Sequence, residues 1–434
     1  MSLKIVILTS IILFSLVRIF RRKEKINLFD ILIISHVLFL GLYPLIDIIN
    51  GNYQSGLIVF IFSVSYILIT LGLLRLSLIL FIPNRIKKNL RLELLIQKAS
   101  VIRQNYIHFS FVIAAVIILY FFLKFSLIFR VVNEELYIVN TYRQIISSTV
   151  LPLLTFVSIC SLTKIMDINY DNKSKTISYV YFILITLYWL FYGRREFIFH
   201  ILIMGLIWFV TTNQPINLKA FFYGLIGLGF IAIGSNIYQN LREDLLLYSV
   251  YEEFSVSKDF VEMALDFETS GGNLERRSSA LPLLSKSIEM ISNNEESSKG
   301  EILMTSVINA IPNILLKNKV YIDNDIIITR QLQMPYKDVN TNLYTCFYID
   351  FVYLSWLILP AFFFIYYMVV ALALYYLRNS HIMFVLVFLE GISASYNLET
   401  PVSDILVSIR QIIIITFLYF TLSYLLRVLF RIHL

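Results

Sequence analysis

Residues 57–82 have the sequence LIVFIFSVSYILITLGLLRLSLILFI, in which Arg75 is the single charged residue. An apolar run of this length can cross the hydrocarbon core of a bilayer as one helix. Similar runs recur along the chain, and 58% of its 434 residues are hydrophobic whereas only 15% are charged. Soluble domains do not have this composition. Because the runs are long and do not alternate, they argue against a β-barrel. The sequence therefore predicts an all-α polytopic membrane protein.

The apolar runs predict about eleven transmembrane helices. We place them at residues 3–20, 27–49, 57–82, 106–129, 147–165, 177–193, 197–213, 220–238, 347–377, 382–398 and 405–430. Basic residues follow the first run instead of preceding it, which predicts a retained membrane helix rather than a cleaved signal. The ninth run is long enough to tilt or to continue along the membrane surface. The expected organisation is eight spans in residues 1–238, a large polar segment in residues 239–345, and three spans in residues 346–434.

Lys and Arg residues are concentrated in the loops on one side of the predicted spans. These loops hold Arg21, Arg22, Lys23, Lys25, Arg85, Lys87, Lys88, Arg91, Lys98, Arg103, Lys164, Lys173, Lys175, Lys219, Arg378, Arg427 and Arg431. The short loops on the other side hold only Arg130, Arg143, Arg194 and Arg195. Positive residues favour the cytoplasmic side, so the N-terminus and the polar segment are expected outside the cytoplasm and the C-terminus inside. The net charge of +7 follows from this pattern and does not call for a nucleic-acid partner.

The polar segment is predicted to be a partly helical lid over the outer ends of the spans. Apolar residues recur at helical spacing over residues 245–267 and 281–291. A third apolar stretch, residues 302–316, is expected to lie on the membrane surface and to bend at Pro312. Residues 322–345 carry too little pattern to assign.

Several kinds of chemistry have no support in the sequence. The five histidines are scattered, with no pair at metal-ligand spacing, and His36 is expected to be a hydrogen-bonded core residue. No glycine-rich phosphate loop and no Gly-x-Ser-x-Gly motif occur. Cys160 and Cys346 both lie at predicted spans, which argues against a disulfide. We therefore expect no metal and no other cofactor.

Arginines on the outer face are the strongest candidates for a binding site. Arg194 and Arg195 occupy the turn between the sixth and seventh spans, where the charge bias disfavours them. Two guanidiniums at an interface suit bidentate binding of phosphate or pyrophosphate. The alternative is that they snorkel to lipid headgroups or pair with Glu196.

Two further groups combine a base with acids. Arg242, Glu243 and Asp244 directly follow the eighth span, where they could bind a phosphate and deprotonate a hydroxyl or form a solvated first helical turn. Glu390 and Arg410 are expected at similar depth on either side of the last outer turn. Charges within a membrane are usually paired, so we expect an intramembrane ion pair, with a structural role at least as well supported as a catalytic one.

Two local motifs and the predicted topology resemble the O-antigen polymerase (Wzy-type) family of bacterial oligosaccharide repeat unit polymerases. The stretch from Ala310 to Lys319, AIPNILLKNK, resembles the Ile-Pro-(Arg)-x-(Ile/Leu)-Trp-Pro-x-Lys stretch in the large outer loop of that family. The residues Tyr348-Ile349-Asp350-Phe351 resemble the Tyr-x-(Asp/Asn)-Phe-Gly that follows it. This chain departs from the pattern, with Asn313 in place of Arg, Leu315-Leu316 in place of Trp-Pro and Val352 in place of Gly.

The resemblance implies glycosyl transfer at the periplasmic face of a bacterial inner membrane. A glycan on undecaprenyl pyrophosphate would pass to the non-reducing sugar of a new lipid-linked repeat unit. The lipid pyrophosphate would leave, and a separate chain-length regulator would be a possible partner. By position, Arg194 and Arg195 would hold the pyrophosphate, together with Lys317 or Lys319. Outer-face arginines could stabilise this leaving group without a metal. Of the nearby carboxylates, Glu243 is our choice of base, ahead of Asp244 and Asp350.

Three alternatives remain. An O-antigen ligase type of transferase shares the plan but is expected to carry a histidine in the large outer loop, and residues 239–345 contain none. A lipid-linked glycan transporter is expected to have short loops and inner cationic cavities. A non-catalytic scaffold would leave Arg194 and Arg195 without a purpose.

Overall fold

The computed structural model describes most of the chain as helices. The described residues are 2–21, 26–49, 51, 53, 55–125, 149–167, 170–192, 194–212, 280–292, 297–312, 315–316, 324–333, 342–396 and 402–430. Within these ranges the structure contains no β-strand, and a single isolated bridge joins Asn27 to Arg91. The chain forms two compact units, one of residues 1–94 and 275–434 and the other of residues 95–274. The expectation of an all-helical protein is confirmed for the described residues.

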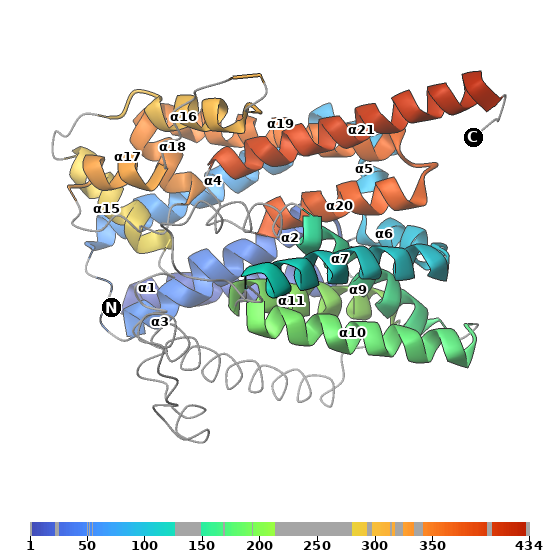
Figure 1. The fold of residues 1–434 in the computed structure, drawn as a ribbon. Helices are drawn as coiled ribbons and strands as arrows, with labels where there is room; N and C mark the ends of the chain where they lie inside the picture. The colour runs from blue at the N-terminus through green and yellow to red at the C-terminus, as the bar shows by residue number, and fades with distance from the viewer. Residues whose placement is uncertain are drawn as a thin grey trace. The chain divides into compact units, whose positions relative to one another are not determined.

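The first unit joins the N-terminal helices to the C-terminal part of the chain (Figure 1). Its N-terminal elements are α1 (Ser2–Arg21), α2 (Leu28–His36), the π-helix η2 (Val37–Leu42), α3 (Tyr43–Ile49), α4 (Leu57–Phe81), α5 (Asn84–Lys87) and the 3-10 helix η3 (Lys88–Leu90). Its later elements are α15 (Ala280–Ser292), α16 (Glu301–Ala310), α17 (Asn324–Gln331), α18 (Leu343–Phe351), the 3-10 helix η5 (Val352–Leu354), α19 (Ser355–Tyr376), α20 (His381–Tyr396) and α21 (Val402–Phe430).

Helix α19 lies at the centre of this unit and packs against α4, α20 and α21, while α2 packs against α20. Helices approach closely at Gly391 of α20. A Cβ atom added there would lie 2.9 Å from Leu28 Cδ1 and 3.1 Å from Val370 Cγ1. A glycine at this position lets three helices pack at short distance.

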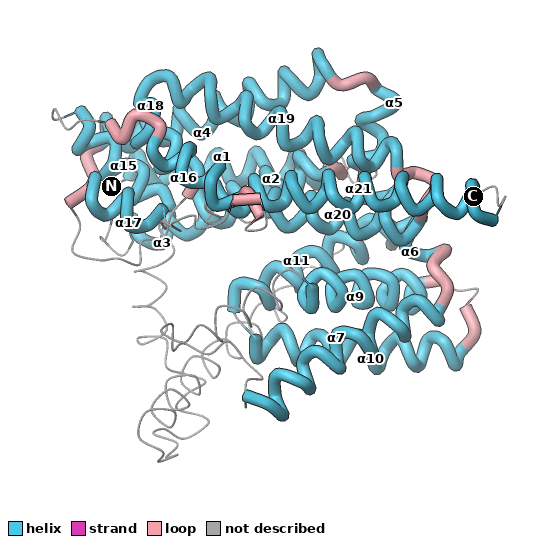
Figure 2. Tube along the Cα trace, turned by 45° about the horizontal axis from the view of Figure 1, so that its top comes forward, coloured by secondary structure: helices cyan, strands magenta, loops and turns pink. Residues whose placement is uncertain are grey.

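The second unit contains α7 (Gln104–Phe125), α9 (Leu151–Met166), α10 (Asn172–Tyr192) and α11 (Arg194–Thr211). Helix α9 packs against the other three, and Figure 2 shows these helices running alongside one another. The short helix α6 (Leu92–Ser100) connects the two units, and it meets α7 at an angle of 99°.

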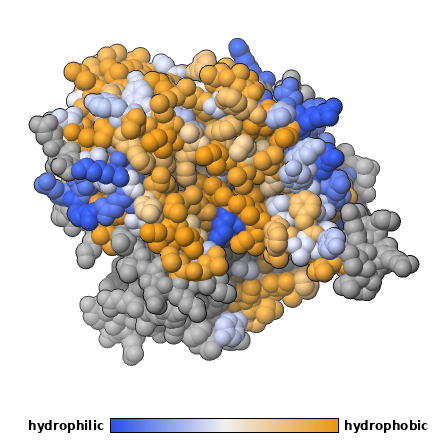
Figure 3. All heavy atoms as spheres, turned by 90° about the horizontal axis from the view of Figure 1, so that it is seen from above, coloured by the Kyte–Doolittle hydropathy of each residue, from blue (hydrophilic) through white to orange (hydrophobic). Residues whose placement is uncertain are grey.

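Four helices are long and apolar enough to cross a membrane. They are Leu28–Ile49 (α2, η2 and α3), Leu57–Phe81 (α4), Leu343–Tyr376 (α18, η5 and α19) and Val402–Leu425 (within α21). A fifth results if the bent pair of α6 and α7 is one span. Figure 3 shows a mostly apolar face, with hydrophilic side chains gathered toward two of its edges and in one small patch near its middle. The described residues thus hold fewer such helices than the eleven predicted, and the predicted span at 220–238 lies outside them.

The polar segment is helical where it is described, although its helices differ in detail from the predicted ones. The predicted helix at 281–291 is confirmed as α15. The apolar stretch at 302–316, which was expected to bend at Pro312, is helical only as far as Ala310, where α16 ends. The residue before a proline avoids helical backbone angles, and Ile311 has φ −68° and ψ 132°. Helix α17 lies in a stretch that could not be assigned, and the predicted helix at 245–267 lies outside the described residues.

The predicted ninth span is interrupted near its start. Helix α18 ends at Phe351, and Val352 has φ 48° and ψ −120° before α19 begins. A β-branched residue rarely adopts a positive φ, so this backbone is strained. The break separates a short helix, α18, from the long apolar helix α19.

Candidate functional site

The described residues of the two motifs lie at opposite ends of α16. Helix α16 begins after Gly300, which has φ 91° and offers no side chain to cap the helix. The cap comes instead from Asp350 of α18. The backbone N–H of Ile302 donates to Asp350 Oδ1 at 3.1 Å, and that of Leu303 donates to Oδ2 at 2.8 Å.

Asp350 also accepts a hydrogen bond from the hydroxyl of Ser298, which lies in the turn before α16. The backbone N–H of Ser298 donates to the carbonyl of Ile349 at 3.0 Å, so the same turn is held twice. A carboxylate is favoured at a helix N-terminus because free N–H groups and the helix dipole point toward it. Asp350 is only 3% exposed, and three donors already occupy its two oxygens. This arrangement suits an anchor for α16 better than a free catalytic base.

The opposite end of α16 is held by Arg410 of α21. The Arg410 Nη1 atom donates to the carbonyl oxygen of Ala310 at 2.6 Å, and α16 packs along α21. A cation is favoured at a helix C-terminus for the same electrostatic reason that an anion is favoured at the N-terminus. Ala310 is also the first residue of the Ile-Pro stretch. Asp350 and Arg410 therefore fix both ends of the helix that leads into this stretch.

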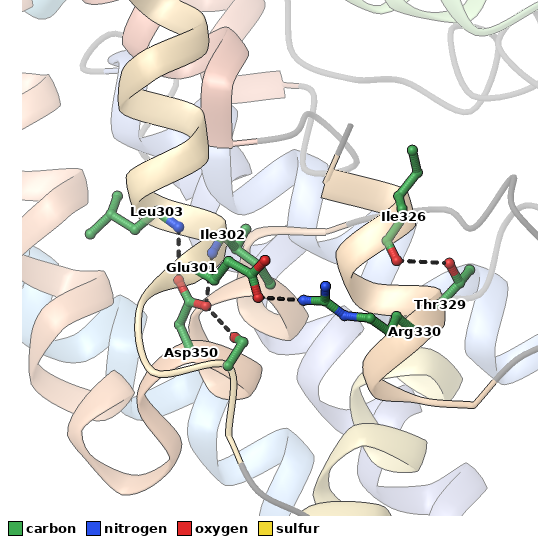
Figure 4. Close-up of polar contacts among 8 residues, drawn as sticks. Glu301, Ile302, Leu303, Ile326, Thr329, Arg330 and Asp350 are labelled. Carbon is green, nitrogen blue, oxygen red and sulfur yellow. Dashed lines mark hydrogen bonds and ion pairs between the residues drawn. The ribbon is translucent and has the colours of Figure 1, made fainter. Parts of the chain in front are cut away.

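Helix α17 is attached to α16 by one buried and one exposed polar contact. The side-chain nitrogen Nδ2 of Asn324 donates to Ser306 Oγ at 3.1 Å, and both side chains are buried. Arg330 forms an ion pair with Glu301, and the two side chains point toward one another in Figure 4. They are 61% and 40% exposed, so water screens this pair and its contribution to stability is small.

The structure does not join Glu390 to Arg410 in the expected ion pair. The guanidinium of Arg410 binds Ala310 instead, and no ion pair between the two predicted residues occurs in the described chain. The backbone carbonyl of Glu390 accepts a hydrogen bond from the hydroxyl of Tyr366 at 3.3 Å.

The other predicted site residues are described only in part. Arg194 and Arg195 are the first two residues of α11, which starts just after α10 ends at Tyr192. Their side chains lie outside the description. The remaining predicted residues, Arg242, Glu243, Lys317 and Lys319, lie outside the described residues altogether.

His36 is confirmed as a hydrogen-bonded core residue. Its Nδ1 lies 2.7 Å from the carbonyl oxygen of Leu32, and its Nε2 lies 2.6 Å from the hydroxyl of Tyr344. Because a carbonyl oxygen can only accept, Nδ1 carries the proton, and in the neutral ring Tyr344 donates to Nε2. This contact ties α2 to α18, the helix that carries Asp350.

Sequence reasoning missed Ser298, Glu301 and Arg330 because their partners are distant in the chain or exposed. The sequence offered one local signal: Glu301 directly follows Gly300, and an acidic residue is favoured in the first turn of a helix. In the part of the chain that the structure describes, no three His, Cys, Asp or Glu side chains gather closely enough to hold a metal ion. Comparisons with protein-family models, with curated proteins and with solved structures found no match.

Proposed function

We propose that this chain is a glycosyltransferase that polymerises lipid-linked oligosaccharide repeat units at the periplasmic face of a bacterial inner membrane. In the reaction, a hydroxyl of the acceptor sugar attacks the anomeric carbon of the donor glycan. The bond between that carbon and the pyrophosphate oxygen breaks, and undecaprenyl pyrophosphate leaves with the electron pair. The product is a surface polysaccharide of the O-antigen kind.

The observation that carries the proposal is the anchoring of α16. The two stretches that resemble the polymerase family, which begin at Ala310 and Tyr348, are separate in sequence. Asp350 of the second stretch holds the N-terminus of α16, and α16 delivers the first residue of the other. The two stretches are therefore connected through α16, which supports a shared role in the proposed reaction. Lys317 and Lys319 follow directly in the sequence, and we propose that they bind the anionic substrate.

We propose the following roles for the ionisable residues. Arg194 and Arg195 at the start of α11 would bind the pyrophosphate and stabilise the charge that develops as it leaves. Glu243, with Arg242 beside it, remains the proposed base for the acceptor hydroxyl. Asp350 and Arg410 are positioning residues that act through α16, and no metal or other cofactor takes part.

The proposal includes about eleven transmembrane helices, a periplasmic N-terminus and a cytoplasmic C-terminus. The positive-inside pattern supports this topology. The polar segment would then lie in the periplasm, where lipid-linked repeat units and a chain-length regulator are accessible to it.

The first test compares surface glycan from cells with and without this chain on a gel, in the native glycan background. Loss of the chain is expected to leave lipid core bearing a single repeat unit. Long polymer on the lipid carrier with none on core would instead identify a ligase, and an unchanged ladder would favour a transporter or scaffold.

The second test concerns Arg194 and Arg195. Changing both to Ala is expected to abolish polymer while the protein stays inserted, and changing both to Lys is expected to restore only part of it, because bidentate geometry is lost. Full activity of the double alanine variant would contradict the pyrophosphate role.

A further inference from the structure

One end of the first unit carries a dense group of basic residues. The chain from Ile82 to Leu92 contains four basic residues and no acid. Arg378 lies two residues after the end of α19, which packs against α5 and η3. We call this group the basic end, and its members are Arg85, Lys87, Lys88, Arg91 and Arg378. In sequence, the members of the basic end follow the C-terminal ends of two long apolar helices, α4 and α19.

Most of these cations are accessible. Arg85, Lys88 and Arg378 are exposed, and none of the three pairs with an acidic side chain among the residues that the structure describes. Lys87 is occupied, since its Nζ donates to the carbonyl oxygen of Ile79 at 2.7 Å and closes the end of α4. The guanidinium of Arg378 lies 4.9 Å from the centre of the Tyr375 ring, which limits the directions that it can take. The nearest acid along the chain is Glu93, which is also exposed.

Large apolar side chains are exposed directly beside these cations. On the last turn of α4, Ile79 is 55%, Leu80 65% and Phe81 70% exposed, and Tyr376 on the last turn of α19 is 56% exposed. A span of 25 residues such as α4 is about 37 Å long, which carries its end past the hydrocarbon core to the headgroup region. The basic end therefore meets the membrane where phosphates and acyl chains are both within reach.

We propose that the basic end is a docking surface for anionic phospholipids. Phosphate groups would bind Arg85, Lys88 and Arg378, while the acyl chains of the same lipids would cover the exposed apolar residues of α4. The paired chemistry selects a lipid over free phosphate, because a free ion would leave the apolar side chains uncovered. Anionic headgroups attract basic residues next to a span. This inference is independent of the proposed catalytic function.

The experiment uses the full chain purified in detergent and titrated with phosphatidylglycerol or with phosphatidylcholine of the same acyl chains. Cys160 and Cys346 are both buried and free, so a thiol-reactive dye reports thermal unfolding. A ligand that binds only the folded state raises the unfolding temperature. Phosphatidylglycerol is expected to act at lower concentration than phosphatidylcholine, and high salt is expected to reduce the difference.

Charge-neutral variants locate the effect. Each of Arg85→Gln and Lys88→Gln is expected to raise the half-maximal phosphatidylglycerol concentration about fivefold, and the double variant about 25-fold. The matched control is Lys286→Gln, which removes an exposed lysine of α15 outside the basic end. It is expected to leave the half-maximal phosphatidylglycerol concentration unchanged.

Three outcomes would overturn the proposal. The first is an equal response to the two lipids, and the second is a double variant that responds like the wild type. The third is inorganic phosphate reproducing the full shift, which would indicate a simple anion site. If the double variant does not fold, the salt dependence of the wild type decides the question, because screening weakens a headgroup contact and leaves an acyl contact intact.

Discussion

Replacing Asp350 with Ala separates an anchoring role from a catalytic one. The carboxylate accepts hydrogen bonds from the N–H groups of Ile302 and Leu303 and from the Ser298 hydroxyl. The hydroxyl can turn to another partner, but the two N–H groups are fixed by the helix. Each N–H group left without an acceptor costs about 1–3 kcal/mol, so we expect Asp350→Ala to lower the stability of the docked α16 and α18 by about 3 kcal/mol. That value corresponds to about a 150-fold increase in the open population.

Cys346 provides the assay because it lies in α18 with Asp350 and is only 1% exposed. In a Cys160→Ser background, the labelling rate of Cys346 under native conditions measures the opening of α18. Asp350→Ala is expected to accelerate labelling strongly. Asp350→Asn keeps one acceptor oxygen and is expected to have about half the effect in free energy. The matched control labels Cys160 in a Cys346→Ser background. Cys160 lies in the second unit, so Asp350→Ala should leave its rate unchanged.

The same variants distinguish the two roles through polymer formation. If Asp350 is an anchor, polymer should decline in step with Cys346 protection, and Asp350→Asn should retain part of the activity. If Asp350→Ala abolishes polymer while Cys346 reacts at the wild-type rate, the anchoring argument is refuted and Asp350 acts on the substrate.

Three further substitutions test the packing and the ends of the helices. Gly391→Ala is expected to destabilise the protein by about 1–3 kcal/mol, because the new Cβ would meet Leu28 and Val370. The control Gly72→Ala has no atom within 4 Å of the new Cβ and should not lower the unfolding temperature; equal losses at both glycines would contradict the argument. Val352→Gly is expected to stabilise the protein by about 1 kcal/mol, measured by thermal unfolding, since glycine adopts the positive φ without strain. A lower unfolding temperature would show that the packing of the valine side chain outweighs the backbone strain. Arg410→Met removes the donor to the Ala310 carbonyl and is expected to destabilise the docked α16 by about 1.5–3 kcal/mol, with Arg410→Lys intermediate between the wild type and Arg410→Met. Limited proteolysis of the polar segment measures the release of α16. An unchanged digestion pattern would contradict the anchoring role of Arg410.

The all-helical class and several helix positions could be predicted because they depend on local composition and period. Helix α15 is one such case, since its apolar residues recur at helical spacing. The end of α16 at Ala310 follows from the sequence, because Ile311 precedes Pro312 and a residue before proline avoids helical backbone angles. The break at Val352 has no local signal, because valine favours extended backbone. The polymerase-family pattern that residues 348–351 resemble has a glycine at the position of Val352. The positive φ of Val352 is one that glycine adopts readily.

The candidate site could be predicted less well because its contacts connect distant parts of the chain. Asp350 was identified as an outer-face carboxylate, yet its partners lie 47 to 52 residues earlier. Equal depth in the membrane predicted a pairing of Glu390 with Arg410. Depth does not determine which way a guanidinium points, and the C-terminal carbonyl of α16 is a competing acceptor that only the tertiary structure provides.

The contact between Arg410 and Ala310 has a consequence for how the protein is made. Its partners are one hundred residues apart, and a ribosome adding about 5–20 residues per second needs about 5–20 s to synthesise the intervening chain. During that interval the nascent α16 has left the ribosome without its C-terminal partner, and Asp350 reaches the N-terminal end only midway. In the proposed topology the polar segment would cross the membrane before it could dock, and the insertion of α21 would then lock a helix that was synthesised well before it.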